Sequence, residues 1–284
     1  MEQIIRIARN KITLETTPLK EETLKLETFQ PKGLLGITIE VVVDEEGCMP
    51  TKSKPIKDHL QLAAVYKSLL QKAVRRMNLK EGIKAFDWLW VNDRTSLLRR
   101  ITIISLEDGF YNPIWNSFWI WLLLLDSRGY AFNDSIRIEM RKQVGELILH
   151  PLYSRIKEVN SVRNLDYMRN LDLVPLVIRK EYGGMPGDMR MIQNFLETYR
   201  PNPELQRLPL MHPTTEAEIF EACDFHVFPW LAKTDAQRVM FWECRSRINL
   251  RDRSTMSRAF ESNQALKDYD HFCRNLYQSM VGSQ

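Results

Sequence analysis

The pattern of hydrophobic and polar positions has a period of two near the start of the chain. Between residues 37 and 43, Ile37, Ile39, Val41 and Val43 alternate with other residues, which predicts a strand with one buried face. Weaker alternating runs at residues 12–14 and 24–26 precede it. The sequence DEEG at residues 44–47 is typical of a turn. The first 55 residues therefore predict a small sheet or β-hairpin, with residues 51–55 as a connector.

From residue 57 the pattern becomes helical. Leu62, Tyr66, Leu69, Ala73 and Met77 recur at spacings that place them on one face of a helix. The same reasoning predicts a short helix around residues 83–90, one from about residue 95, one opened by Asn112-Pro113, one capped by Asn133-Asp134, and further helices at 151–160, 172–181, 189–199, 215–223, 235–247 and 254–279.

The helix opened by Asn112-Pro113 is apolar nearly all round, with Trp115, Trp119 and Trp121 among its residues. Such a helix is typical of the centre of a fold, wrapped by other elements. We therefore expect a mainly α fold, an irregular multi-helix array with a small N-terminal β-strand or hairpin region. The expected domains are a small β-containing region at residues 1–55 and an α-helical domain at residues 56–284.

Composition narrows the class of protein. Hydrophobic residues make up 44% and charged residues 27% of the 284 residues, which is ordinary for a globular protein. Arg6, Arg9 and Lys11 interrupt the start of the chain, so it does not resemble a signal peptide. The most apolar stretch, at residues 113–125, is shorter than the roughly 20 residues that span a bilayer. These features predict a soluble cytoplasmic protein.

The four cysteines do not predict a metal site. They are too few and too scattered for a disulfide scaffold, so reduced buried thiols are expected. Cys223 and His226, with Cys244, His271 and Cys273 further on, invite a zinc interpretation. No second tight pair of ligands completes such a site. We expect neither a metal nor a cofactor.

The glycine cluster at residues 183–188 (GGMPGD) is the one segment with the composition of a phosphate-binding loop. A P-loop requires Lys and Ser or Thr after its last glycine, whereas Asp188 follows here and would oppose an anion. The expected structure is a tight turn that ends one helix, with Asp188 capping the next. The sequence therefore does not predict an ATPase of the P-loop kind.

Asp224 and His226 raise the question of catalysis. A carboxylate and an imidazole two residues apart can form an acid–base pair. No nucleophile lies nearby in the sequence, which favours a buried histidine bonded to the backbone or to a carboxylate.

The segment from residue 245 to residue 258 is the strongest candidate for nucleic-acid contact. It carries five arginines and one carboxylate, Asp252, a net charge of +4 that equals the charge of the whole chain. Arginine suits phosphate oxygens, and the nearby tryptophans could stack on unpaired bases. The alternative interpretation is that the arginines lie on a solvated helix face and that the tryptophans pack in the core. The candidate residues are Arg245, Arg247, Arg251, Arg253, Arg258, Trp230 and Trp242.

Residues 85–113 resemble part of a known module. Leu98-Arg99-Arg100-Ile101, then Glu107-Asp108-Gly109 and Asn112-Pro113, are similar to the helical C-terminal collar of clamp-loader-like AAA+ proteins of the replication-associated recombination factor A and Werner helicase-interacting type. In that family the collar assembles subunits into a ring. The upstream ATPase domain is absent here, so the resemblance implies a collar-like domain without a motor. Helix packing alone also explains the motif, with Arg99 and Arg100 facing solvent.

Three hypotheses for function follow. The leading one is a non-enzymatic DNA-metabolism accessory protein of bacteriophage origin. It would bind single-stranded DNA and a polymerase or other replication or transcription partner in the cytoplasm of the host. The alternative is a protein-interaction or oligomerisation scaffold with no role in binding nucleic acid. A further alternative is an enzyme that uses Asp224 and His226.

The arginine segment generates the first prediction. Replacing Arg247, Arg251 and Arg253 by alanine should weaken single-stranded DNA binding and flatten its salt dependence, because fewer counterions are released on binding. Fluorescence anisotropy of a labelled oligonucleotide at two salt concentrations measures both effects. Unchanged affinity would remove the segment from consideration.

Overall fold

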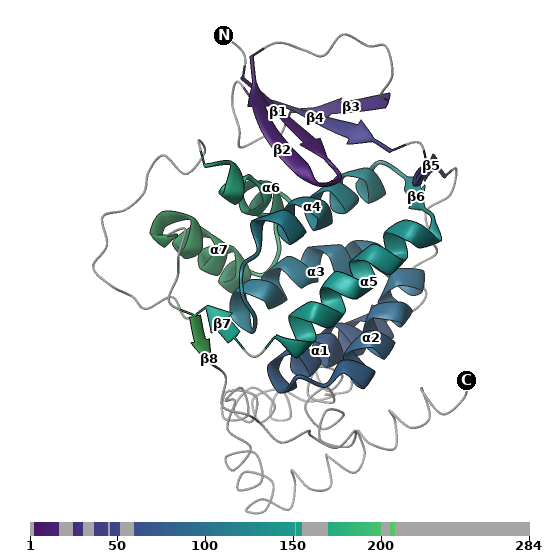
Figure 1. The fold of residues 1–284 in the computed structure, drawn as a ribbon, viewed down its shortest axis with the longest axis vertical. Coiled ribbons are helices and arrows are strands. Elements are labelled where there is room, and N and C mark those ends of the chain that lie inside the picture. The colour runs from purple at the N-terminus through teal and green to yellow at the C-terminus, as the bar shows by residue number, and fades with distance from the viewer. Residues whose placement is uncertain are drawn as a thin grey trace, which may run out of the picture.

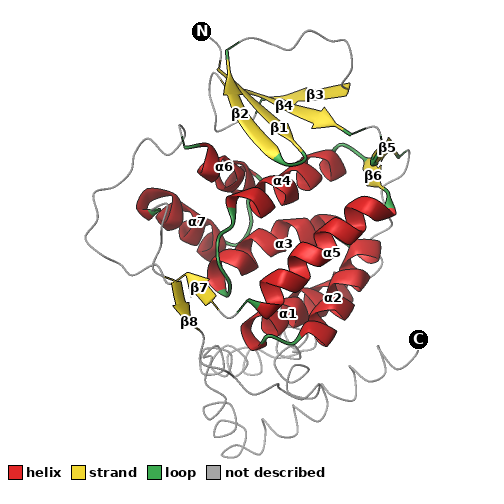
Figure 2. Ribbon diagram, viewed as in Figure 1, coloured by secondary structure: helices red, strands yellow, loops and turns green. Residues whose placement is uncertain are grey.

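The computed structural model describes residues 3–16, 25–30, 37–44, 46–51, 60–150, 152–154, 170–199 and 205–207. Within these residues the chain is mostly helical, with a small sheet formed by its N-terminal part (Figures 1 and 2). The expected mainly α fold with an N-terminal β region is confirmed.

The N-terminal sheet has four strands in the order β2-β1-β4-β3. Its central strands, β1 and β4, run parallel, and both outer pairs are antiparallel. The predicted strand at residues 37–43 is confirmed, and β2 and β3 contain residues 12–14 and 25–26 of the two weaker runs, whereas β1 was not predicted. The bounds are β1 (Gln3–Ala8), β2 (Lys11–Glu15), β3 (Lys25–Phe29) and β4 (Ile37–Val43).

The two central strands share one buried face. Ile5 lies opposite Ile39 and Ile7 lies opposite Val41, and all four belong to the hydrophobic core. Arg6 and Glu40 are opposite each other as well and form an ion pair of 2.7 Å between Nη2 and Oε2. The pairing register therefore places apolar side chains on apolar ones and opposite charges together.

Seven α-helices follow within the described residues, and local sequence explains where several of them begin. Asn112 and Asn133 cap their helices as predicted, each accepting a hydrogen bond from a first-turn backbone N–H. Asn78 and Asp93 cap two more in the same way. The bounds are α1 (Leu60–Arg76), α2 (Leu79–Asn92), α3 (Arg94–Glu107), α4 (Pro113–Ser127), α5 (Asp134–Leu149), a 3₁₀ turn η2 (Leu171–Leu173), α6 (Val174–Glu181) and α7 (Pro186–Thr198).

Two further strand pairs are short. β5 (Cys48–Pro50) pairs antiparallel with β6 (Tyr130–Phe132), and β7 (Leu152–Ser154) pairs antiparallel with β8 (Leu205–Arg207). The prediction of a helix at residues 151–160 is therefore wrong at its start. Pairing with a strand distant in the sequence decides the conformation there, and such pairing leaves no local signal.

The helices predicted at residues 215–223, 235–247 and 254–279 lie outside the described residues, as do residues 52–55 of the predicted connector.

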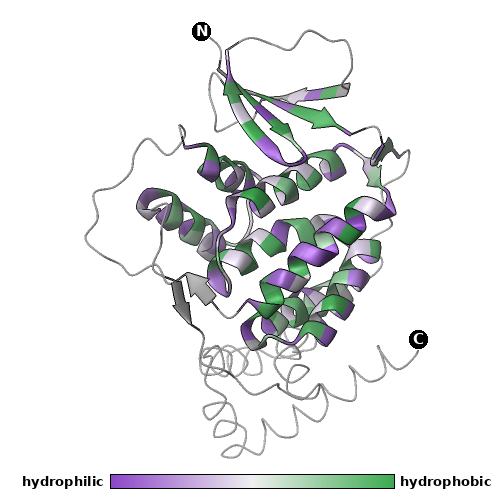
Figure 3. Cartoon of the chain, viewed as in Figure 1, coloured by the Kyte–Doolittle hydropathy of each residue, from purple (hydrophilic) through white to green (hydrophobic). Residues whose placement is uncertain are grey.

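Helix α4 is the centre of the fold. All ten residues from Asn116 to Leu125 are buried. The N-terminal sheet covers one side of α4, and α3 and α6 pack on other sides (Figure 1). Figure 3 shows the strongly hydrophobic character of this helix. Trp121 donates from Nε1 to the Val42 carbonyl oxygen at 2.7 Å, which ties α4 to the sheet.

The predicted core tryptophans lie close to where they were expected. Trp119 and Trp121 are fully buried, and Trp88 and Trp115 are half-buried and packed against the core. In the part of the chain that the structure describes, no helix is long and apolar enough to cross a membrane.

The central position of α4 generates a stability prediction. Leu123→Ala should destabilise the protein by about 2–5 kcal/mol, because Leu123 is 0% exposed and its removal leaves a cavity. The matched control is Ile114→Ala in the same helix, where the side chain is 64% exposed and the change should be within about 0.5 kcal/mol. Urea unfolding measures both, and equal effects would contradict the central role of α4.

Candidate anion-binding site

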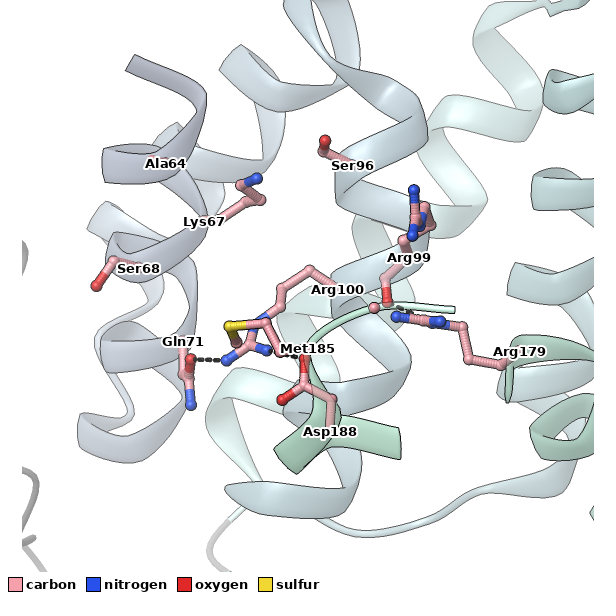
Figure 4. A pocket seen from close by; sticks show the side chains of 11 residues that line it. Ala64, Lys67, Ser68, Gln71, Ser96, Arg99, Arg100, Arg179, Met185 and Asp188 are labelled. Atoms are coloured by element: carbon pink, nitrogen blue, oxygen red, sulfur yellow. Dashed lines mark hydrogen bonds and ion pairs between the residues drawn. The ribbon is translucent and has the colours of Figure 1, made fainter. Parts of the chain in front are cut away.

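A pocket of about 380 Å³ lies between α1, α3 and the hairpin formed by α6 and α7 (Figure 4). Four cationic side chains and one carboxylate reach it from these elements. Its described lining residues are Ala64, Lys67, Ser68 and Gln71 from α1, Ser96, Arg99 and Arg100 from α3, Arg179 from α6, Gly184 and Met185 from the loop between α6 and α7, and Asp188 from α7.

Arg100 crosses the pocket between two helices. It donates from Nη1 to Asp188 Oδ2 at 3.0 Å and from Nη2 to Gln71 Oε1 at 2.5 Å, as the dashed lines in Figure 4 show. Its Nη2 also lies 3.5 Å from Glu107 Oε2. The charge of Arg100 is therefore balanced by carboxylates, and this arginine joins α1, α3 and α7.

Arg179 is different, because its partners carry no formal charge. It donates from Nε to the Arg99 carbonyl oxygen at 2.7 Å and from Nη1 to the Gly183 carbonyl oxygen at 2.8 Å. The residue is only 3% exposed. Burial, the largest cause, and the charges of Arg99 and Arg100 together lower the pKa of Arg179 to about 10, and the charge of Asp188 partly opposes them. The group remains a cation at neutral pH, in surroundings that disfavour its charge.

Arg99 also contacts backbone oxygens. Its Nη2 donates to the carbonyl oxygens of Tyr182 and Gly183, at 2.9 and 3.2 Å. These carbonyl groups end α6, so Arg99 serves as a C-terminal cap and meets the negative end of the helix dipole. Within the described residues no carboxylate forms an ion pair with Arg99 or Arg179. Two guanidinium groups are thus held in place without a counter-charge.

The pocket consequently carries a positive charge. Lys67, Arg99, Arg100 and Arg179 against Asp188 give the lining residues a formal net charge of +3. Next to the pocket, Arg75 pairs with Glu107 and Asp108. Including these three neighbours leaves five cations and three carboxylates, a net charge of +2. A recess with this balance attracts anions.

The glycine cluster forms one wall of the pocket. Gly183 and Gly184 have φ angles of +64° and +154°, a region that side chains disfavour, and they end α6 in the predicted tight turn. The prediction that Asp188 caps the next helix is wrong. Helix α7 begins earlier, because Pro186 occupies its first turn, and Met185 at the N-cap makes no side-chain hydrogen bond. Asp188 instead pairs with Arg100.

The structure also corrects the expectation that Arg99 and Arg100 face solvent. Both are half-buried and line the pocket, because α6 and α7 pack over this side of α3. Glu107 is the last residue of α3, and Asp108 is its C-cap. Sequence reasoning missed Lys67 and Arg179 as site residues. Two signals in the sequence could have indicated them. Arg179 is a basic residue four positions before Gly183, and the helical periodicity places Lys67 off the apolar face of its helix.

The candidate nucleic-acid residues of the sequence lie outside the described residues. This applies to Arg245, Arg247, Arg251, Arg253, Arg258, Trp230 and Trp242, and equally to Asp224, His226 and the possible zinc ligands Cys223, Cys244, His271 and Cys273. Cys48 is described and is buried as a free thiol, as expected. Burial, the largest cause, raises its pKa to about 11, and the charge of Asp44 adds to the shift. Among the described residues, no three His, Cys, Asp or Glu side chains come together as metal ligands would.

Comparisons of the chain with protein-family models, with curated proteins and with solved structures each found no match. The site is therefore interpreted from its own geometry.

The charge balance of the pocket generates a prediction. Asp188→Asn should strengthen the binding of inorganic phosphate, on the order of threefold to tenfold, because it removes the carboxylate closest to the cations. Binding raises the melting temperature through linkage, by about 2–4 °C per kcal/mol in a chain of this size. The measurement is a thermal-shift titration with phosphate against chloride at equal ionic strength. Weaker stabilisation by phosphate in the variant than in the wild type would contradict an anion site here.

Proposed function

We propose that this protein is a non-enzymatic accessory factor of DNA metabolism that binds single-stranded DNA, and that the pocket between α1, α3 and the α6–α7 hairpin takes part in holding its phosphates. The carrying observation is that Arg99 and Arg179 line the pocket and, among the described residues, have carbonyl oxygens as their only partners. Guanidinium groups are well matched to phosphate oxygens in charge and in geometry.

The shape of the pocket favours single strands over duplexes. A duplex presents its phosphates on a stiff rod, with a persistence length of about 50 nm, and cannot bend one of them into a recess. A single strand rotates freely about its backbone and can do so. The arginine-rich segment at residues 245–258 supports the same function from the sequence, since it provides phosphate contacts along a strand.

The rest of the proposal comes from the sequence. The collar resemblance supports a replication or transcription protein as partner, and the proposal also includes a bacteriophage origin and action in the cytoplasm of the host. The resemblance places Arg99 and Arg100 in a motif, and in this chain the same two residues line the pocket.

Replacement of Arg99 tests the proposal. Arg99→Gln should weaken single-stranded DNA binding about tenfold or more, because a hydrogen bond to a charged group contributes about 1.5–3 kcal/mol. The slope of log affinity against log salt should fall by about 0.7, the value for one phosphate contact on a single strand. Anisotropy of an internally labelled oligonucleotide measures both. Arg99→Lys keeps the charge and should recover part of the affinity.

The matched control is Arg141→Gln. Arg141 lies on α5, pairs with Asp87 and does not line the pocket, so the variant has the same change of charge at another place. Its affinity should stay within about twofold of the wild type. Equal losses in the two variants would reduce the effect to net charge, and no loss in Arg99→Gln would exclude the pocket from DNA binding. No binding by the wild-type protein at low salt would overturn the proposed function and favour the scaffold alternative.

A further inference from the structure

The size of the pocket limits what can enter it. About 380 Å³ lies near the lower end of the range of roughly 300–1,000 Å³ that is typical of small-molecule sites. One phosphate group with part of its nucleotide fits such a volume, whereas a length of strand needs an extended groove. The pocket is therefore suited to one phosphate group and does not follow the backbone over several nucleotides.

The charge of the pocket discriminates between two kinds of phosphate. An internal phosphodiester carries one negative charge, and a phosphate monoester carries about −1.5 to −2 at pH 7. The lining residues have a net charge of +3, so the monoester gains more from the same cations. A monoester also presents three terminal oxygens as acceptors, where a diester presents two.

The donors are held in place before any ligand binds. Carbonyl oxygens fix Nε and Nη1 of Arg179, while Nη2 makes no hydrogen bond to a described residue. Gly184 lies beside that nitrogen, since a Cβ at this position would lie 3.6 Å from it. Among the described residues, Arg99 is held through Nη2, and its Nε and Nη1 make no hydrogen bond to any of them. Donors fixed in this way lose little conformational entropy on binding.

A helix terminus adds to the cationic side chains. The N-terminus of α7, a helix of 13 residues, lies at the pocket, since Met185 and Asp188 both line it. Its N-cap has no side-chain hydrogen bond, so first-turn N–H groups are not satisfied by Met185. The one carboxylate of that turn, Asp188, is paired with Arg100 at 3.0 Å, which offsets its repulsion of an anion.

We propose that this pocket binds a phosphate monoester, held between Arg99, Arg179 and the N-terminus of α7. The inference rests on the proposed function in one respect: it takes the monoester to be the terminal phosphate of a DNA strand. A free nucleoside monophosphate offers the same chemistry and is the competing source.

The experiment compares DNA strands of one sequence that differ only in their end groups. Internally labelled single-stranded oligonucleotides of one sequence, with a 5′-phosphate, a 3′-phosphate or hydroxyl groups at both ends, are titrated by anisotropy with the full chain at one salt concentration. At least one phosphorylated form should bind about tenfold more tightly than the hydroxyl form, a difference of about 1.4 kcal/mol. Arg99→Gln should abolish this difference, and Arg141→Gln should leave it unchanged.

The second arm uses a nucleoside monophosphate as probe. It should compete with the phosphorylated strand and not with the hydroxyl strand, and it should raise the melting temperature of the wild type more than that of Arg99→Gln. Asp188→Asn should enlarge the preference for the phosphorylated end.

The outcomes separate this inference from the proposed function. Equal binding of all three strands overturns the monoester pocket and leaves single-stranded DNA binding intact. Stabilisation by the nucleoside monophosphate without binding of any strand supports the pocket, makes a free nucleotide its ligand and overturns the proposed function. A preference for phosphorylated ends that persists in Arg99→Gln overturns the assignment to this pocket. If no strand binds and the nucleoside monophosphate does not stabilise the protein, both the monoester pocket and the proposed function are overturned.

Discussion

The burial of α4 is the constraint on which the other parts of this fold depend. A helix with ten consecutive buried residues cannot have a solvent-exposed face, so elements must cover it on every side. The N-terminal sheet supplies one cover, and the Trp121 hydrogen bond to the Val42 carbonyl oxygen satisfies the polar atom that this contact buries. On other sides α3 and α6 complete the enclosure. Sheet and helices consequently share one hydrophobic core.

Covering α4 also creates the pocket. Helix α3 packs against α4 with its apolar residues, which turns Arg99 and Arg100 toward α1 and the α6–α7 hairpin. Helix α6 brings Arg179 to the same place. Carboxylates balance Arg100 and Arg75, whereas Arg99 and Arg179 contact carbonyl oxygens and no carboxylate in the part of the chain that the structure describes. A buried cation without a counter-charge reduces stability, and an anionic ligand relieves that penalty when it binds. The guanidinium groups that lower the stability of the fold for this reason are thus the same groups that an anionic ligand would contact.

The sequence predicted the parts of the fold that depend on neighbouring residues. Alternation identified β4, and asparagine caps identified where α4 and α5 begin. Sequence reasoning failed where pairing with a distant strand decides the conformation. β1 pairs in parallel with β4, and β7 is a strand because β8 pairs with it. Asp188 looked like a helix cap from its position after a glycine. In the structure Pro186 starts the helix earlier, and Arg100 of another helix takes the carboxylate.

The sequence by itself therefore determined the class of fold, the presence of the described helices, the apolar central helix and the tight turn at Gly183 and Gly184. These features arise from the period of the hydrophobic residues and from short-range hydrogen bonds, which a linear pattern records. Only the tertiary structure decided the candidate site. Lys67, Arg99 and Arg179 lie on three helices far apart in the sequence, and no spacing rule connects them. Which charges remain unbalanced depends on which side chains meet, and packing in three dimensions decides that.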